Sequence, residues 1–315
     1  IKAAAYPLRF FFAVTNRDTK MSTRIAYIIV IIIWSTTPLA IQWSGEDVGF
    51  RFGVTSRMVL GMLSTFVLLL VLRGKLPAHA KALQTYFASG LGIYAAMSCV
   101  YWAAQVIPSG WISIIFGLSP LITGILAAIL LGEDALVPHK LVGICLGFVG
   151  LIITFGQGFE SGEASMLGIF ATLLGTIFHC VSAVSVKKID AGLSGLSVTA
   201  GGLLVAVPLY LSTWFITASE IPVTIEWRAA LSIVYLGTIG TAVGFVLYYY
   251  VLKHMDVSRV SLITLITPVC AIALGYSLNE EPISRSLVIG TACILSGLFC
   301  YQFGYSIRKR FFAAT

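Results

Sequence analysis

The chain has 315 residues, of which 58% are hydrophobic and only 10% are charged. A soluble domain carries about 25% charged residues, so this sequence cannot cover a water-facing surface of its size. The mean hydropathy of +0.96 agrees, and the composition excludes an ordinary soluble domain. The net charge of +7 does not indicate a nucleic-acid partner, because most of the basic residues lie in loops on one side of the predicted membrane topology.

Residues 1–20 are expected to be a disordered extension outside the fold. The stretch PLRFFFAV is too short and too interrupted for the apolar core of a signal peptide. Met21 and the residues that follow it look like a natural start, directly before the first long apolar run.

Ten apolar runs then follow one another, each long enough to cross about 30 Å of hydrocarbon. Within lipid every backbone polar group must be satisfied internally, which only helices and closed barrels achieve. The runs are continuous rather than alternating, so they predict helices. They lie at about 25–44, 53–72, 83–104, 108–131, 139–157, 164–186, 194–217, 228–252, 257–278 and 285–306. The expected fold is an all-α polytopic membrane protein with ten transmembrane helices.

The basic residues favour a cytoplasmic location for both termini. With the N-terminus inside, 16 of the 20 Lys and Arg residues lie on the cytoplasmic side, and Arg51, Arg57, Arg228 and Arg285 lie on the other. Without residues 1–20 the split is still 12 to 4. The positive-inside rule therefore predicts an integral plasma (inner) membrane protein whose loops 45–52 and 218–227 face outward.

The sequence repeats itself. Residues 94–133 align with residues 242–281 at an offset of 148, which superposes Ser119-Pro120 on Thr267-Pro268 and Glu133 on Glu281. Each half holds five spans, and because five is odd the second half enters from the opposite face. We therefore predict two inverted five-helix repeats, at residues 21–158 and 159–310.

Pro120 and Pro268 fall near the middle of the fourth and ninth spans. A proline at this depth removes a helical hydrogen bond, and the freed carbonyl is tolerated only where protein or a water-filled cavity satisfies it. The prolines are interpreted as a symmetric pair of bends that gate a central cavity. The alternative is two packing kinks left by a gene duplication.

These features resemble the drug/metabolite transporter superfamily, in its EamA-type branch. The residues that carry the resemblance are Trp34, Arg57, Tyr101-Trp102, Ser119-Pro120, Glu133, Gly143, Tyr248-Tyr249-Tyr250, Thr267-Pro268, Glu281 and Gly290. The sequence departs from the family at Ser35, where Gly is usual, and at Asn279-Glu280-Glu281, where Gly-Glu is common. The resemblance implies a ten-helix carrier that exports, or sometimes imports, small metabolites.

Candidate substrate-binding residues are the polar and aromatic side chains at mid-depth. Arg57 would suit a carboxylate or phosphate, although it could also snorkel to the interface. His179 is a candidate for proton coupling or substrate binding, and as a lone buried histidine it could equally be a packing residue. Aligning the two halves places His179 opposite Trp34. Aromatic or hydroxyl lining is expected from Trp34, Thr37, Tyr94, Tyr101, Tyr248 and Tyr249, each of which could instead serve helix packing.

Several absences narrow the function. No Asp or Glu lies at the middle of a predicted span, and no HExxH, GxSxG or Walker A motif is present. The six cysteines lie within apolar runs without a CxxC pair, so no metal or other cofactor is expected. The GxxxG patterns at 143–147 and 240–244 indicate internal packing or dimerisation, and the oligomeric state stays open.

The sequence therefore predicts a secondary-active transporter of a small organic metabolite rather than an enzyme. Export by alternating access around a mid-membrane cavity is the expected mode, with the lipid bilayer as the other partner. A lipid-interacting or structural membrane protein and a membrane-embedded enzyme are the alternatives.

Overall fold

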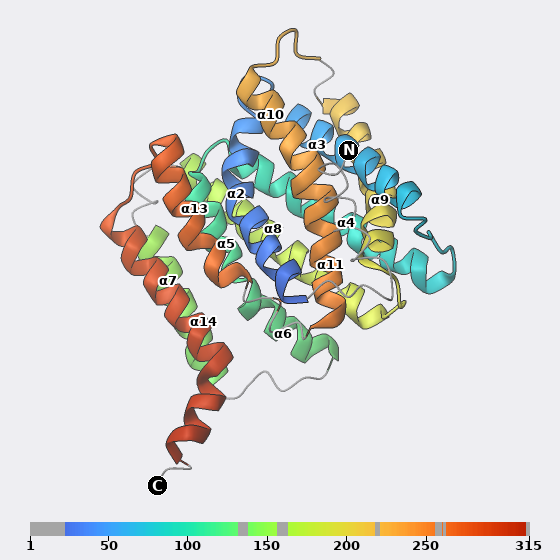
Figure 1. Ribbon diagram of the computed structural model, residues 1–315. Coiled ribbons are helices and arrows are strands. Elements are labelled where there is room, and N and C mark those ends of the chain that lie inside the picture. Colours follow the sequence, from blue (N-terminus) through green and yellow to red (C-terminus); the bar gives the residue numbers. More distant parts are fainter. Residues whose placement is uncertain are drawn as a thin grey trace, which may run out of the picture.

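The computed structural model describes residues 23–131, 138–155, 163–217, 221–255, 260 and 263–312, and its regular structure is helical throughout (Figure 1). The described helices form ten spans. Eight are single helices, and the first six of these are α2 (Thr23–Ser44), α3 (Phe50–Val71), α4 (Ala80–Ala103), α7 (Pro138–Phe155), α8 (Glu163–Ile189) and α9 (Gly195–Thr217). The fourth span is α5 (Ser109–Phe116) with α6 (Ser119–Leu131), and the eighth is α10 (Trp227–Tyr235), the π-helix η2 (Leu236–Val243) and α11 (Gly244–His254). The last two are α13 (Ile263–Asn279) and α14 (Arg285–Phe312).

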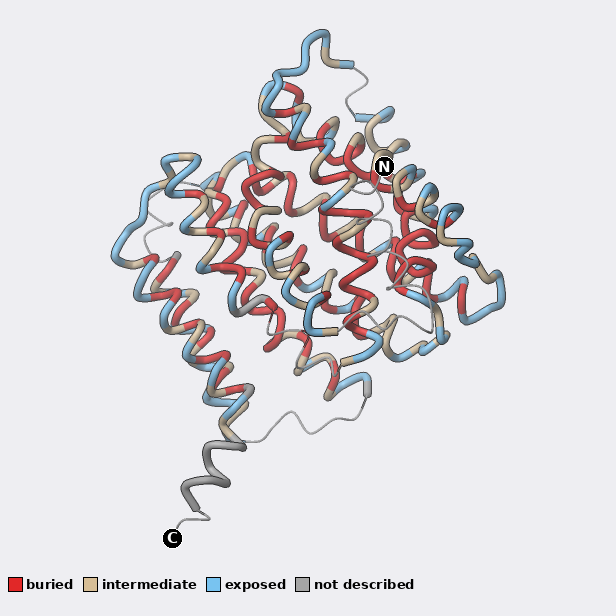
Figure 2. The backbone as a smooth tube through the Cα atoms, in the orientation of Figure 1, coloured by how far each residue is buried: buried red, intermediate tan, exposed pale blue. Residues whose placement is uncertain are grey.

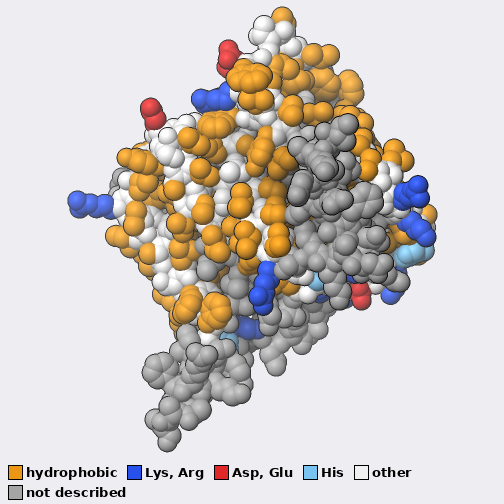
Figure 3. All heavy atoms as spheres, in the orientation of Figure 1, with side chains coloured by type: hydrophobic (Ala, Val, Ile, Leu, Met, Phe, Trp, Pro, Cys, Tyr) orange, Lys and Arg blue, Asp and Glu red, His pale blue; other side chains and the backbone are white. Residues whose placement is uncertain are grey.

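The outside of the bundle is apolar, as a membrane protein requires. Six described segments are long and apolar enough to cross a bilayer, and three shorter apolar helices accompany them. Large aliphatic side chains such as Leu70, Ile129 and Ile152 are 77%, 73% and 69% exposed. Orange apolar atoms cover much of the visible face in Figure 3, while buried residues concentrate along the inner faces of the helices in Figure 2. The chain is thus a multi-pass membrane protein.

The two halves pack against each other span by span. α3 contacts α9, α5 contacts α13, and α7 contacts α14, each of which is the matching span of the other half. The contact of α4 with α8 has its counterpart in the contact of α2 with α11. This pairing is the arrangement expected of two inverted five-helix repeats related by a pseudo-two-fold axis.

Glycines bring the fifth and tenth spans into backbone contact, and α7 and α14 run side by side in Figure 1. A Cβ on Gly143 would lie 2.6 Å from the carbonyl oxygen of Gly297, and one on Gly150 would lie 2.6 Å from that of Gly290. Such close approach is what small residues allow between membrane helices. The first GxxxG pattern therefore serves packing within the chain.

The paired prolines differ in their surroundings. α5 ends three residues before Ser119-Pro120, and the Ser119 hydroxyl donates a 2.5 Å bond to the carbonyl of Phe116, the one that the missing N–H of Pro120 leaves free. Pro268 lies inside the continuous helix α13. The two prolines thus occupy matching positions in the repeat, but the helices around them differ. In the first half one helix ends and another begins beside the proline, whereas in the second half the helix continues through it.

A polar network joins helix ends at the face where α2 and α13 finish. The Glu281 carboxylate accepts bonds from the Ser109 amide (3.1 Å), the Ser109 hydroxyl (2.6 Å) and the Gly110 amide (3.2 Å). Asn279 accepts a 2.9 Å bond from the Trp43 indole. At the same face Arg228 forms a bidentate ion pair with Glu46. Glu133, the partner of Glu281 in the repeat, lies outside the described residues.

Candidate functional site

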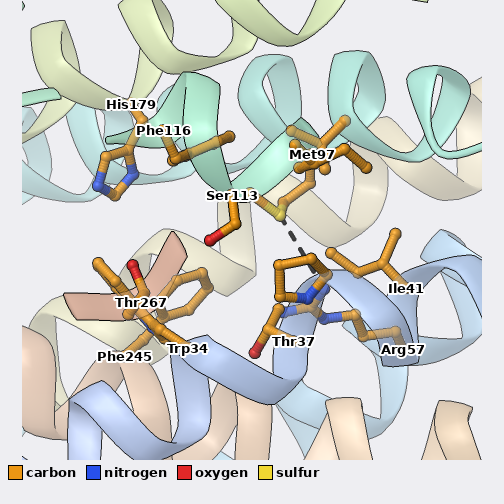
Figure 4. Close-up of a pocket in the computed structure, with 13 residues that line it drawn as sticks. Trp34, Thr37, Ile41, Arg57, Met97, Ser113, Phe116, His179, Phe245 and Thr267 are labelled. Carbon is orange, nitrogen blue, oxygen red and sulfur yellow. Dashed lines mark hydrogen bonds between the residues drawn. The ribbon is translucent and has the colours of Figure 1, made fainter. Parts of the chain in front are cut away.

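A cavity of about 80 Å³ lies among the middle parts of seven helices from both halves. α2, α3, α4 and α5 contribute from the first half, and α8, α11 and α13 from the second. Its thirteen lining residues are Trp34, Thr37, Pro38, Ile41, Arg57, Met97, Val100, Ile112, Ser113, Phe116, His179, Phe245 and Thr267 (Figure 4). Four of the predicted site residues, Trp34, Thr37, Arg57 and His179, are thus brought together around one space.

Arg57 is the charged group of this cavity. Its side chain is only 2% exposed, its Nε donates to the Thr241 hydroxyl at 3.0 Å, and its Nη1 lies 4.0 Å from the Met97 sulfur. The guanidinium also lies 5.8 Å from the centre of the Tyr101 ring. No carboxylate pairs with it in the described part of the chain, where the one salt bridge joins Arg228 to Glu46. A buried cation without a counter-ion is costly and usually marks a functional site.

The π-helix places Thr241 against Arg57. A Cβ on Gly61 of α3 would lie 2.5 Å from the Thr241 methyl carbon, and one on Gly237 would lie 2.6 Å from Leu60 Cβ. These two glycines let η2 approach α3 closely enough for the Arg57–Thr241 bond. The π-turn shifts the register of the span, as π-bulges near functional sites do. The sequence indicated neither the π-helix nor Thr241.

An aromatic cluster forms the other end of the cavity. The His179 ring centre lies 5.8 Å from that of Trp34, 5.9 Å from that of Phe116 and 5.6 Å from that of Tyr248. Trp34 and Tyr248 are 4.9 Å apart. His179 thus lies beside Trp34, as the alignment of the two halves predicts, and makes no hydrogen bond within the described residues. Ring contacts of this kind provide an apolar surface with polar edges.

Three hydroxyl groups lie around the cavity. Thr37 donates to the carbonyl of Ile33 at 2.7 Å, so its oxygen can still accept a bond. Ser113 and Thr267 line the cavity, are 3% and 4% exposed, and make no side-chain hydrogen bond in the part of the chain that the structure describes. The repeat alignment contains a signal for both residues, because Ser113 matches a serine in the second half and Thr267 directly precedes the repeated proline. Neither was predicted as a site residue, nor were Met97, Phe116 and Phe245, which carry no polar signal.

The four predicted tyrosines are not among the lining residues. Tyr101 lies behind Arg57, and Tyr248 packs on Trp34 and His179. The Tyr94 hydroxyl lies 2.6 Å from that of Thr213, with its ring against Tyr210. Tyr249 lines a separate pocket with Lys187 and Lys253. Tyr101 and Tyr248 therefore support the cavity from outside, while substrate contact by any of the four stays a prediction.

This fold defines a class: a helical membrane protein whose two halves enclose a mid-span cavity. The model of the EamA-like transporter family matches residues 21–156 and 166–302. The chain belongs to that family, so it is a membrane transporter.

Individual relatives span nearly the whole chain. The uncharacterized transporter YoaV of Bacillus subtilis is 25% identical over 291 residues, covering 90% of this chain and 97% of that protein. The probable amino-acid metabolite efflux pump of Escherichia coli is 25% identical over 299 residues, with 90% and 95% coverage. One solved crystal structure shares the fold with a TM-score of 0.68 at 21% identity, covering 89% of this chain and 96% of that one.

Proposed function

We propose that the protein is a secondary-active carrier that exports a small organic metabolite by alternating access. The observation that supports this most is Arg57, a buried cation without a carboxylate partner in the described residues, on a cavity that both halves build. The similarity to a probable amino-acid metabolite efflux pump supports export and a small-molecule cargo. The cavity of about 80 Å³ is smaller than the roughly 300–1,000 Å³ of most ligand sites, so the helices would separate to admit a substrate.

In this proposal the fourth and ninth spans carry the gates. α5 and α13 contact each other, bring Ser113 and Thr267 to the cavity, and contain or adjoin the two prolines. Pro120 and Pro268 would set the bends about which the two spans move. His179 would bind substrate or carry a coupled proton, since its ring lines the cavity.

Transport should depend on the cavity residues and not merely on a folded chain. Cells that overproduce the protein are expected to accumulate at least one metabolite in the medium, measured by untargeted comparison with cells lacking it. Trp34→Ala and His179→Gln should reduce this accumulation by about tenfold or more, because both rings line the cavity. Unchanged accumulation in both variants would show that Trp34 and His179 serve helix packing and not transport.

Matched controls are available for that experiment. Trp227, which is 74% exposed at the start of α10, and His254, at the end of α11, lie away from the cavity. Trp227→Ala and His254→Gln should leave accumulation within about twofold of the unmodified protein, since surface changes of this kind have small effects.

The orientation in the membrane can be tested directly. Both termini are proposed to be cytoplasmic, which places Val223 outside and Lys75 inside. Val223 is fully exposed, and all six native cysteines are reduced and lie in spans. A membrane-impermeant maleimide should therefore label Val223→Cys in intact cells and Lys75→Cys only after lysis. The reverse pattern would invert the orientation.

Two other functions remain as alternatives to a carrier. A lipid-interacting or structural protein would give no solute flux after reconstitution into liposomes, whereas a carrier would. A membrane-embedded enzyme would need a cluster of catalytic polar groups, and the described cavity offers one cation, one imidazole and three hydroxyls without a carboxylate. That composition fits binding better than bond cleavage.

A further inference from the structure

The two ends of the cavity differ in chemistry. Figure 4 shows Arg57 with Met97 and Ile41 at one side, and His179 with Phe116, Trp34 and Phe245 at the other. We propose that the substrate is a monocarboxylate with an apolar or aromatic body and no ammonium group beside its carboxylate. This inference rests on the proposed carrier function and specifies its substrate class.

The Arg57 end suits a carboxylate. A guanidinium has five N–H donors, and here Nε is used by Thr241 while Nη1 faces only the weak acceptor sulfur of Met97. Nη2 makes no hydrogen bond within the described residues. Two parallel bonds to the oxygens of one carboxylate would use these free donors, since that is the geometry of Arg–carboxylate pairs.

The charge balance favours a monoanion. Among the thirteen lining residues in the described part of the chain, Arg57 is the one Lys, Arg, Asp or Glu. A single negative charge on the occupant would therefore neutralise the site, whereas a phosphate dianion would leave an excess of charge away from water. With His179 neutral, the described lining thus lacks the second cation that a phosphate dianion needs.

An ammonium on the carbon next to the carboxylate would be poorly placed. It would lie beside Arg57, a like charge, where the side chains of Ile41 and Met97 are apolar (Figure 4). The described lining offers no carboxylate to pair with it, only the hydroxyl oxygens of Thr37, Ser113 and Thr267. Burying an unpaired charge is expensive, so an α-amino acid should bind more weakly than the same acid without its amino group.

The other end accepts an apolar body. Trp34, Phe116 and His179 form contiguous ring contacts of 5.8 and 5.9 Å, and Phe245 lies on the same side of the cavity (Figure 4). A phenyl ring or branched alkyl chain would pack against these rings. The free hydroxyls of Ser113 and Thr267 lie along the cavity, where they could bond a neutral keto or hydroxyl substituent.

Three probes that share a phenylethyl group test the inference: 3-phenylpropionate, phenylalanine and 2-phenylethylamine. They carry a carboxylate alone, both groups, and an ammonium alone. Calorimetric titration of the purified full chain in nanodiscs, with empty nanodiscs as blank, should give 3-phenylpropionate the lowest Kd, about tenfold or more below that of phenylalanine. The amine should bind most weakly. The aliphatic pair 4-methylpentanoate and leucine should rank in the same order.

Arg57→Gln provides the matched variant. It should raise the Kd of 3-phenylpropionate by about tenfold or more while leaving that of the neutral 3-phenylpropanamide within about twofold, because only the charged pair is lost. The amide also reports whether the variant is folded. Arg51→Gln, on the same helix at an exposed position, should change neither value.

Tighter binding of phenylalanine or the amine, or equal loss of acid and amide binding in Arg57→Gln, would overturn the substrate class. Absence of binding by both carboxylates would overturn it as well. None of these results would contradict the carrier function, which the accumulation of metabolites in the medium tests separately.

Discussion

Replacing Gly290 by valine is expected to destabilise the protein by about 3 kcal/mol, because α14 would have to move away from α7. A Cβ at Gly290 would lie 2.6 Å from the carbonyl oxygen of Gly150 and 2.7 Å from the amide nitrogen of Thr154. The Thr154 hydroxyl is also in the way and could rotate aside, but these two contacts are backbone atoms of a helix and cannot. The measurement is the thermal unfolding midpoint of detergent-purified protein, together with the monodisperse fraction on size-exclusion chromatography.

Two further substitutions calibrate this result. Gly290→Ala should give a smaller loss in the same direction, since it adds one methyl group to the same contact. Val288→Ile, two residues earlier at a 56% exposed position on the same helix, should be neutral. An unchanged unfolding midpoint of Gly290→Val would mean that the backbones of α7 and α14 are not in close contact.

Removing the Glu281 carboxylate should cost about 2–4 kcal/mol of folding free energy, since it would leave the first amides of α5 without an acceptor. Glu281→Ala deletes bonds from the Ser109 amide and hydroxyl and from the Gly110 amide. It also deletes a favourable charge at a helix N-terminus. Because α5 carries Ser113 and Phe116 to the cavity, solute flux should fall as well.

Glu226 is the control for this prediction. It is the exposed residue before α10, and its side chain makes no capping bond. Glu226→Ala should therefore change the unfolding midpoint little, whereas Glu281→Gln, which keeps the shape and one acceptor oxygen, should fall between Glu281→Ala and the unmodified protein. If the two alanine variants have the same unfolding midpoint, Glu281 does not stabilise the N-terminal end of α5.

The span structure of this protein was readable from sequence because the bilayer imposes it. Hydrocarbon thickness fixes the length of each apolar run, and the ten predicted runs differ from the observed spans mainly by a few residues at their ends. The repeat of Ser/Thr-Pro, together with the odd number of spans in each half, predicted the inverted arrangement. The same alignment placed Trp34 opposite His179, and their rings lie 5.8 Å apart.

The direction in which each side chain points was decided only by tertiary packing. These helices are apolar on nearly all sides, so no hydrophobic stripe in the sequence distinguishes the face toward lipid from the face toward the cavity. Tyr94 was therefore predicted in the site, yet its hydroxyl meets Thr213. Ser113 and Thr267 were not, yet they line the cavity.

Backbone irregularities were equally invisible to sequence. A π-helix shifts the backbone hydrogen-bond register by one residue. It forms in the eighth span, where Gly61 and Gly237 allow that span to approach α3, so that Thr241 can bond to Arg57. The repeated prolines also diverge, since the fourth span breaks before Pro120 while α13 continues through Pro268. The sequence by itself determined the class, the spans and the symmetry of this transporter. Contacts between residues far apart in the chain decided which polar groups share one cavity, because helix rotation depends on the neighbouring helices.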